Sequence, residues 1–264
     1  MLEVSNLILL KLGGSLITDK SKPFTVRKNV LRRICKEIHE ARNEKKFSLI
    51  VGHGGGSFPH TSAQKYQTQK GYINKDSKKG FAIVQNDAAK LNRIVVQELI
   101  NAGENAVSVQ PSSACITKKG KIIDFYLISI KRMLKDDYIP VPYGDVGLDV
   151  VNGCCIISTE EIFNYLAKNL NAKKIILAGK VDGVYDSNRN IIKKITPGNF
   201  NEVKKYIGLS DGTDVTGGMI LKVNKMLQLA KKGVNSIIIN GLKKDAIKNA
   251  LLGKDVKGTV IANE

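Results

Sequence analysis

The sequence predicts an α/β fold in which a mainly parallel β-sheet is covered by helices on both faces, with β-hairpins inserted. Two observations support this prediction. Short apolar runs, of the length of buried strands, alternate along the 264 residues with longer stretches in which apolar residues recur every three or four positions. No low-complexity linker or internal repeat interrupts this alternation, so we expect one domain over residues 1–264.

Six short runs are predicted to form strands that are buried on both faces, because they are mostly apolar rather than alternating. Two stretches with polar tips, around Lys118–Lys121 and Val151–Gly153, are typical of β-hairpin turns. The six predicted strands are Leu7–Leu12, Phe47–Val51, Ala106–Val109, Ile139–Val141, Lys174–Leu177 and Ser236–Ile239.

Between these runs, apolar residues at spacings of three and four predict amphipathic helices. The first stripe runs from Val26 to Ala41, the second from Phe81 to Leu99 and the third from Met219 to Ala230. Each stripe is interpreted as the face that packs on the sheet.

The net charge of +18 raises the question of nucleic-acid binding. Lys-Lys pairs are dispersed from Lys45–Lys46 to Lys243–Lys244, however, and no basic stripe, aromatic–basic interleaving or zinc-finger spacing is present. Dispersed charge supports weak contact with polyanions and also attracts small anionic substrates. We therefore expect a small-molecule substrate and no specific nucleic-acid partner.

No apolar run approaches the roughly 18 residues of a transmembrane helix, and Leu7–Leu12 is too short for the apolar region of a signal peptide. A cytoplasmic protein with no membrane partner is expected. The four cysteines form no C-x-x-C pair and have no histidine at metal-ligand spacing. They are interpreted as small buried residues.

Glycine-rich segments follow the first two predicted strands, at "KLGGS" (11–15) and "GHGGGSFPH" (52–60). Ligands of open α/β sheets bind outside the carboxyl ends of the strands, where glycine lets backbone N–H groups approach phosphate oxygens. Each segment precedes a predicted helix, whose N-terminus attracts anions. Two such loops predict a site for two phosphate-bearing molecules, and neither loop matches a Walker A or G-x-G-x-x-G motif.

A third glycine-rich stretch, "DGTDVTGGMILK", spans Asp211–Lys222 and leads into the third predicted helix. Lys222 follows Gly218 by one helical turn on the same face, where its ammonium group can reach a nucleotide phosphate. A solvent-facing lysine is the alternative, and the residues alone leave it open.

With these stretches in place, the sequence resembles the amino acid kinase superfamily, and most closely its archaeal-type isopentenyl phosphate kinases. The resemblance covers nearly the whole chain, and the order and spacing of the motifs are more specific than any one motif. The histidine that closes the second loop separates this branch from most amino acid kinases. The motifs are "KLGGSLITDK" (11–20), "HGGGSFPH" (53–60), "VSVQPSS" (107–113), "PVPYGDV" (140–146), "VDGVY" (181–185), "DVTGGM" (214–219) and a closing Gly258–Thr259.

The resemblance implies an open αβα sandwich, with an acceptor-binding lobe over about residues 1–170 and an ATP-binding lobe over about residues 171–264. It implies a phosphotransferase that uses ATP and Mg²⁺ to convert isopentenyl phosphate into isopentenyl diphosphate, in an archaeal-type mevalonate pathway to isoprenoids. It also implies a homodimer. The residues by themselves predict only phosphoryl transfer between two bound phosphates.

By this resemblance, His60 hydrogen-bonds the acceptor's phosphate, whose charge raises the pKa of the imidazole, and Gly55 and Thr159 lie beside the acceptor. Lys20 stabilises the transferring phosphoryl group. His53 is expected to be structural, no residue is assigned as a metal ligand, and no general base is needed because the acceptor phosphate is already ionised. The predicted nucleotide-binding residues are Lys11, Gly13, Gly14, Ser15, Gly56, Lys180, Asp182, Gly218 and Lys222.

The chain departs from the family pattern in three places, one of which is Pro59, where the family commonly has a glycine before the histidine that closes the second loop. Glu160 stands where the family has an aspartate that orients the catalytic lysines, and Thr159 stands where it has a glycine. We expect the longer arm of Glu160 to orient Lys11 and Lys222. Gly179–Lys180 replaces a Thr-Asp pair on the nucleotide side.

These departures leave two alternatives open. A fosfomycin-kinase-like enzyme or another small-acid kinase shares much of the pattern. A nucleotide- or anion-binding relative without turnover would also keep it. The range of accepted alkyl phosphates depends on a pocket for which the predicted helix Phe81–Leu99 is the expected wall.

Overall fold

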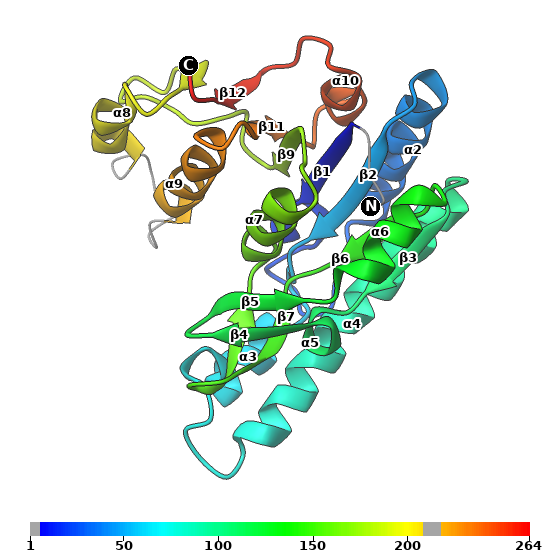
Figure 1. The fold of residues 1–264 in the computed structure, drawn as a ribbon, viewed down its shortest axis with the longest axis vertical. Coiled ribbons are helices and arrows are strands. Elements are labelled where there is room, and N and C mark those ends of the chain that lie inside the picture. The colour runs from blue at the N-terminus through cyan, green and yellow to red at the C-terminus, as the bar shows by residue number, and fades with distance from the viewer. Residues whose placement is uncertain (1–5, 208–217) are drawn as a thin grey trace.

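The computed structural model describes residues 6–207 and 218–264 (Figure 1). The strands of its central sheet are β1 (Leu7–Leu12), β2 (Ser48–His53), β9 (Lys174–Gly179), β10 (Lys194–Ile195), β11 (Asn235–Asn240) and β12 (Gly258–Ile261). Their order is β10-β12-β11-β9-β1-β2, and every neighbouring pair is parallel except β11–β12. The prediction of a mainly parallel sheet is therefore confirmed. Strands from both sides of residue 170 share this sheet.

Two further strands extend the layer beyond β2. β3 (Ala106–Val109) pairs in parallel with β6 (Ile139–Pro142). β6 packs beside β2, and a parallel bridge joins His53 to Tyr143.

Both predicted hairpins are present, and they combine into one four-stranded sheet. β4 (Cys115–Lys118) pairs antiparallel with β5 (Lys121–Phe125), and β7 (Asp145–Asp149) pairs antiparallel with β8 (Gly153–Ile157). A parallel contact between β4 and β7 joins the two hairpins. In Figure 1 this sheet lies at one end of the central sheet, next to α4 (Ser77–Asn101).

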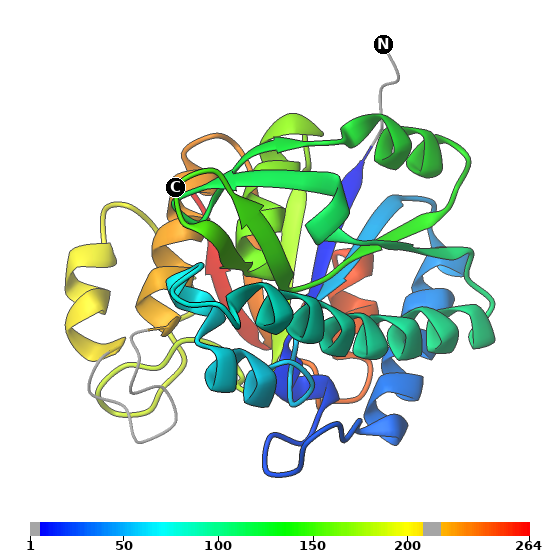
Figure 2. The same ribbon diagram turned by 90° about the horizontal axis from the view of Figure 1, so that it is seen from below.

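Helices cover both faces of the central sheet because its strands are apolar on both faces. In β1, Ile8, Leu10 and Leu12 belong to one buried cluster, whereas Leu7 and Leu9 belong to another. The first cluster includes side chains of α2 (Lys28–Glu44), α4 and α10 (Ala246–Leu252), and the second includes side chains of α6 (Leu127–Lys135), α7 (Thr159–Asn169), α8 (Phe200–Ile207) and α9 (Gly218–Ala230). Figure 2 shows α8 and α9, in yellow and orange, on one side of the strands and α2, in blue, on the other.

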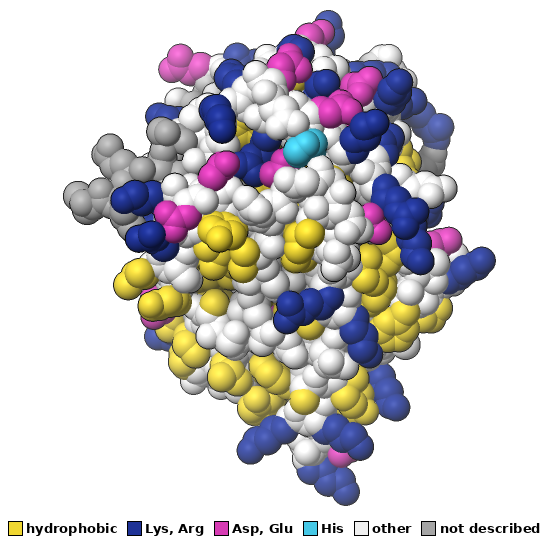
Figure 3. Space-filling model, turned by 90° about the vertical axis from the view of Figure 1, so that its right-hand side faces the viewer, with side chains coloured by type: hydrophobic (Ala, Val, Ile, Leu, Met, Phe, Trp, Pro, Cys, Tyr) yellow, Lys and Arg dark blue, Asp and Glu magenta, His cyan; other side chains and the backbone are white. Residues whose placement is uncertain are grey.

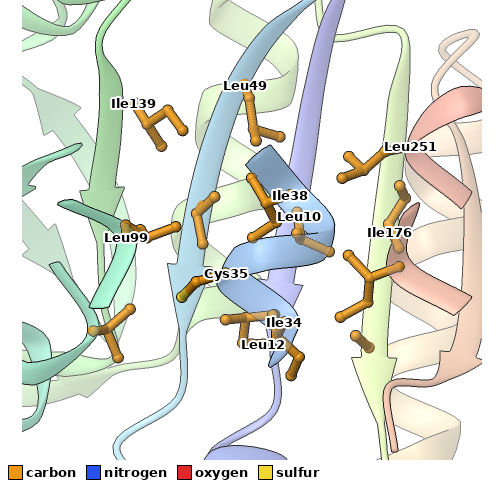
Figure 4. Close-up of a cluster of buried hydrophobic side chains, with 14 of the residues drawn as sticks. Leu10, Leu12, Ile34, Cys35, Ile38, Leu49, Leu99, Ile139, Ile176 and Leu251 are labelled. Carbon is orange, nitrogen blue, oxygen red and sulfur yellow. The ribbon is translucent and has the colours of Figure 1, made fainter. Parts of the chain in front are cut away.

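The first cluster confirms the stripe predicted within α2. Ile34, Cys35 and Ile38 of that helix pack against Leu10 and Leu12 of β1, and all five side chains are fully buried (Figure 4). The predicted burial of the cysteines is also confirmed, because all four are free and buried.

The shorter helices are α1 (Gly14–Ile17), α3 (His60–Tyr66), α5 (Pro111–Ala114) and the 3₁₀-helix η1 (Thr68–Lys70).

One predicted helix boundary is wrong. The first stripe was expected to begin at Val26, but α2 begins at Lys28, and Val26 instead forms an antiparallel bridge with Thr18. The bridge closes the loop that carries Lys20. The stripes predicted from Phe81 and from Met219 lie within α4 and α9.

The surface agrees with the dispersed charge of the sequence. On the face shown in Figure 3, Lys and Arg side chains are scattered among apolar and uncharged groups. Of the helices in residues 6–207 and 218–264, none combines the length and the apolar character needed to cross a bilayer.

Candidate active site

The two glycine-rich loops meet at one edge of the central sheet. Because β1 lies between β9 and β2, the carboxyl ends of these three parallel strands are adjacent. The loop after β1 leads into α1, and the loop after β2 leads into α3. The two loops touch each other, since a Cβ on Gly14 would lie 2.5 Å from the amide nitrogen of Gly56. This close approach explains why glycine stands at position 14.

Backbone amides of both loops are left open. The N–H of Gly13 donates to the carbonyl of Ala178 at 2.8 Å, and the N–H of Gly54 donates to the carbonyl of Leu12 at 3.0 Å. Successive N–H groups without an internal acceptor form a concavity that binds anions. Within the described part of the chain, no protein acceptor lies within hydrogen-bonding distance of the amides of Gly14, Ser15, Gly55 and Gly56 in these loops.

Thr18 fastens the two loops together. Its hydroxyl donates to the carbonyl of Gly14 at 2.7 Å and accepts the N–H of Ser57 at 3.0 Å. Gly56 has a φ of +58°, and a Cβ there would lie 2.3 Å from the same hydroxyl. Thr18 lay inside the motif "KLGGSLITDK" but was not predicted as a site residue, because its role depends on a contact between distant segments.

Lys11 and Glu160 form an ion pair beside these loops. Lys11 lies near the end of β1, and Glu160 lies in the first turn of α7, where the helix dipole favours a negative charge. The two side chains are each 12% exposed and are hydrogen-bonded. Burial lowers the pKa of Lys11, against the attraction of Glu160. Burial alone would raise the pKa of Glu160, but Lys11 and then Lys222 bring it below its usual value.

α9 directs Lys222 toward this pair. The helix begins at Gly218, and Lys222 follows one turn later. The positive charge of Lys222 acts on both members of the Lys11–Glu160 pair. The preceding part of the third glycine-rich stretch, residues 211–217, lies outside the described residues.

A cavity of about 530 Å³ opens beside the loop after β2. Its lining includes Gly55, His60 and Glu160, and most of the lining surface is apolar. Val84 and Ala88 come from α4, on the stretch that was expected to form the pocket wall. The apolar wall also includes Ala63, Ile156 and Ile157, and the polar lining includes Gln64, Gln69, Gly144, Asp145 and Thr159.

Thr159 occupies the wall of this cavity without adding free polar surface. Its hydroxyl donates to the carbonyl of His53 at 2.6 Å, and the side chain is buried. A Cβ on Gly52 would lie 2.8 Å from the methyl group of Thr159. Much of the side-chain volume that Thr159 adds, relative to the glycine of the family, therefore packs against β2.

His60 and Lys20 lie at the mouth of the site. His60 is the first residue of α3, and both residues line a second hollow next to the cavity. Burial and then the charge of Lys20 lower the pKa of His60, so the imidazole is neutral at pH 7 before an anion binds. The structure thus brings together the two residues that were expected to contact the acceptor's phosphate and the transferring phosphoryl group.

The turn after β9 carries the other predicted nucleotide-binding residues. Lys180 is exposed. Asp182 accepts a hydrogen bond from Asn240 at 2.7 Å and pairs with Lys257 at 3.1 Å, and these contacts lower its pKa. Among the described residues, neither Lys180 nor Asp182 is bonded to the Lys11–Glu160 pair.

Asp145 was missed from the sequence although its motif was recognised. It lines the cavity, is buried, and accepts the N–H groups of Ser112 and Val146 at 3.1 and 2.9 Å. Burial raises its pKa to about 6. The only sequence signal was an acid inside the apolar segment "PVPYGDV", and spacing alone did not place that segment beside the glycine loops.

Comparison with known proteins agrees with this geometry. The model of the Amino acid kinase family matches residues 6–240. The chain is 38% identical to the isopentenyl phosphate kinase of Methanocaldococcus jannaschii, over 97% of this chain and 98% of that protein. It is 37% identical to that of Methanothermobacter thermautotrophicus, over 98% and 100%. A crystal structure of isopentenyl phosphate kinase superposes with a TM-score of 0.82 at 34% identity, covering 97% of this chain and 100% of the other. The chain therefore belongs to the amino acid kinase family.

Proposed function

We propose that this chain transfers the γ-phosphoryl group of ATP to isopentenyl phosphate, forming isopentenyl diphosphate and ADP. The observation that carries the proposal is a largely apolar cavity whose lining includes His60 and the glycine loop with its open amides. Such a cavity fits a small alkyl group with a phosphate at one end. The relatives named isopentenyl phosphate kinase match this chain over nearly its whole length and favour this acceptor over fosfomycin or another small acid.

The chemistry requires positioning and positive charge. A phosphate oxygen of the acceptor attacks the γ-phosphorus, the bond from that phosphorus to the β–γ bridging oxygen breaks, and ADP leaves. Lys11 and Lys222 hold the β- and γ-phosphates, and Lys20 stabilises the group in transit. His60 and the N–H of Gly55 hold the acceptor's phosphate.

Glu160 keeps this arrangement in place. Its carboxylate stabilises the charged form of Lys11 and so opposes the effect of burial on the pKa of that side chain. The nucleotide extends over Gly13, Gly14, Ser15 and Gly56 toward the turn that holds Lys180 and Asp182.

Magnesium enters as part of the substrate, MgATP. The described polar groups beside the glycine loops include the ammonium group of Lys11 and several open N–H groups, and the carboxylate of Glu160 is paired with Lys11. In residues 6–207 and 218–264 no cluster of three His, Cys, Asp or Glu side chains has the arrangement of a metal site. We assign the ligands of Mg²⁺ to phosphate oxygens and water, which this ion commonly keeps.

The remaining assignments follow the family resemblance. We assign the acceptor to the lobe of about residues 1–170 and the nucleotide to about residues 171–264. The enzyme is proposed to act as a cytoplasmic homodimer in a mevalonate-type route to isoprenoids.

Purified protein with MgATP and a panel of acceptors tests the function. We expect isopentenyl phosphate to be converted to the diphosphate faster than fosfomycin, glutamate, aspartate or UMP. Turnover of fosfomycin alone would establish the alternative small-acid kinase. Binding of ATP without turnover of any acceptor would identify a relative that has lost catalysis.

A further inference from the structure

His53, the last residue of β2, lies beneath the glycine loop and is fully buried. Its ring stacks on Tyr143, with 5.7 Å between ring centres and 8° between the planes. Burial lowers its pKa to about 4, so the imidazole is neutral at neutral pH. A neutral imidazole has one proton, and the neighbours of its two nitrogens decide where that proton lies.

Both neighbours place the proton on Nδ1. Nδ1 lies 3.1 Å from the carbonyl oxygen of Gly54, which can only accept. Nε2 lies 3.1 Å from Nδ2 of Asn92, and this amide group also donates to the carbonyl of Val141 at 3.1 Å. Because the Val141 carbonyl requires the NH₂ group at this position, Asn92 offers a donor to Nε2. Nε2 is therefore unprotonated.

This tautomer fixes the direction of the peptide between Gly54 and Gly55. The peptide is trans, so its C=O and N–H point in opposite directions. The C=O faces the buried imidazole. The N–H of Gly55 therefore faces away from His53, at the loop that lines the cavity.

The peptide between His53 and Gly54 is also held in one orientation. The carbonyl of His53 accepts two hydrogen bonds, from the hydroxyl of Thr159 at 2.6 Å and from the N–H of Gly144 at 2.9 Å. Both donors come from segments that line the same cavity. The strand end, the imidazole and the cavity wall are thus held in one hydrogen-bonded unit.

Consecutive glycines need such a hold, because glycine loses more backbone freedom on ordering than any other residue. Glycine also tolerates a flipped Gly54–Gly55 peptide, which would present a carbonyl to the anion instead of an N–H. We infer that His53 is a positioning residue for the phosphoryl acceptor: its Nδ1–H holds the Gly54 carbonyl and so directs the Gly55 N–H at the acceptor's phosphate. The inference rests on the proposed function, which places that phosphate at Gly55.

Two substitutions of His53 test the contributions of its two ring nitrogens separately. His53→Asn places an amide NH₂ near the position of Nδ1 and keeps the donor to Gly54, whereas His53→Gln places an amide oxygen near Nε2 and keeps only the acceptor for Asn92. We expect His53→Gln to raise the KM for isopentenyl phosphate about tenfold or more, as for loss of a hydrogen bond to a charged group. His53→Asn should stay within about threefold of the wild type, and the KM for ATP should change little in either variant.

Tyr143→Phe is the matched control, because it keeps the stacked ring and disturbs the same buried layer. It should lower the melting temperature more than it changes the acceptor KM. Equal acceptor KM values in the Asn and Gln variants, whether raised or unchanged, would overturn the inference. Failure of the wild type to phosphorylate isopentenyl phosphate would instead overturn the proposed function.

A measurement on the wild type covers the case in which neither variant folds. The chain has three histidines, so ¹⁵N-histidine labelling yields three sets of ring signals. The set that remains in the spectra of both His39→Ala and His60→Ala belongs to His53, and it should show a protonated Nδ1 and an unprotonated Nε2. A proton on Nε2 of that ring would contradict the inference.

Discussion

The ammonium group of Lys11, near the end of β1, and the carboxylate of Glu160, in the first turn of α7, form an ion pair that is largely shielded from water. Their separation in sequence is 149 residues. The pair links β1, the strand that leads into the first glycine loop, to the helix that borders the acceptor cavity.

Glu160→Gln keeps the size of this side chain and removes its charge. We expect kcat to fall on the order of a hundredfold, because Lys11 loses the group that keeps it charged and oriented. Without the charge of Glu160, burial lowers the pKa of Lys11 further. As the pH is raised, Lys11 should therefore lose its charge, and the variant its activity, at a lower pH than in the wild type.

Glu160→Asp should be milder, since it keeps the charge on a shorter arm. Glu161→Gln is the control on the same helical turn, where Glu161 pairs with Lys225 at 3.0 Å. Steady-state kinetics across pH checks both expectations. Full activity of Glu160→Gln would show that another residue organises the lysines.

Lys20→Ala should lower kcat with little change in either KM, because the charge of Lys20 acts most strongly as the phosphoryl group moves. Lys22→Ala changes an exposed lysine of the same loop and should leave both parameters near those of the wild type. Initial rates with each substrate varied in turn distinguish the two cases. An effect on KM alone would make Lys20 an ordinary binding residue.

His60→Ala should weaken binding of isopentenyl phosphate about ten- to a hundredfold and leave ATP affinity nearly unchanged. Burial and Lys20 hold the pKa of His60 below its usual value in the free site, and a bound phosphate raises it. Acceptor binding near pH 7 should therefore take up a proton.

Calorimetry in two buffers of different ionisation enthalpy measures this uptake. His60→Ala should reduce it, while His39→Ala, which alters the pair with Glu104, should not. The same uptake in wild type and His60→Ala would show that His60 stays neutral in the complex.

The buried imidazole of His53 predicts a pH dependence of stability. Its pKa is about 4 in the folded chain and 6.5 when exposed, so the unfolded chain binds more protons between these values. The contribution of His53 to the free energy of unfolding is therefore largest above pH 6.5, and it decreases by about 3 kcal/mol in total as the pH falls toward 4.

His53→Asn lacks this titration. Its deficit in free energy of unfolding relative to the wild type should therefore shrink as the pH falls from 6.5 to 4, as measured by urea denaturation at each pH. A deficit that stays constant over this range would show that folding does not lower the pKa of His53.

Periodicity and residue type were sufficient for the architecture. The continuous apolar runs predicted strands, because a strand buried on both faces has apolar residues at consecutive positions. The three stripes predicted helices, because a helix buried on one face has apolar residues every three or four positions. Glycine after two buried strands predicted adjoining anion-binding loops, since few other residues allow that backbone approach. The motifs then identified the family, which the comparisons confirm.

Only the tertiary structure decided how distant segments meet. The hydrogen bonds by which Thr18 joins the two loops and the burial of Asp145 in the cavity wall both depend on contacts between distant segments. His53 is the clearest case. Its residue type signals neither burial nor tautomer, because both are set by Asn92 of α4, Gly54 and the strand beside it, which only folding brings together.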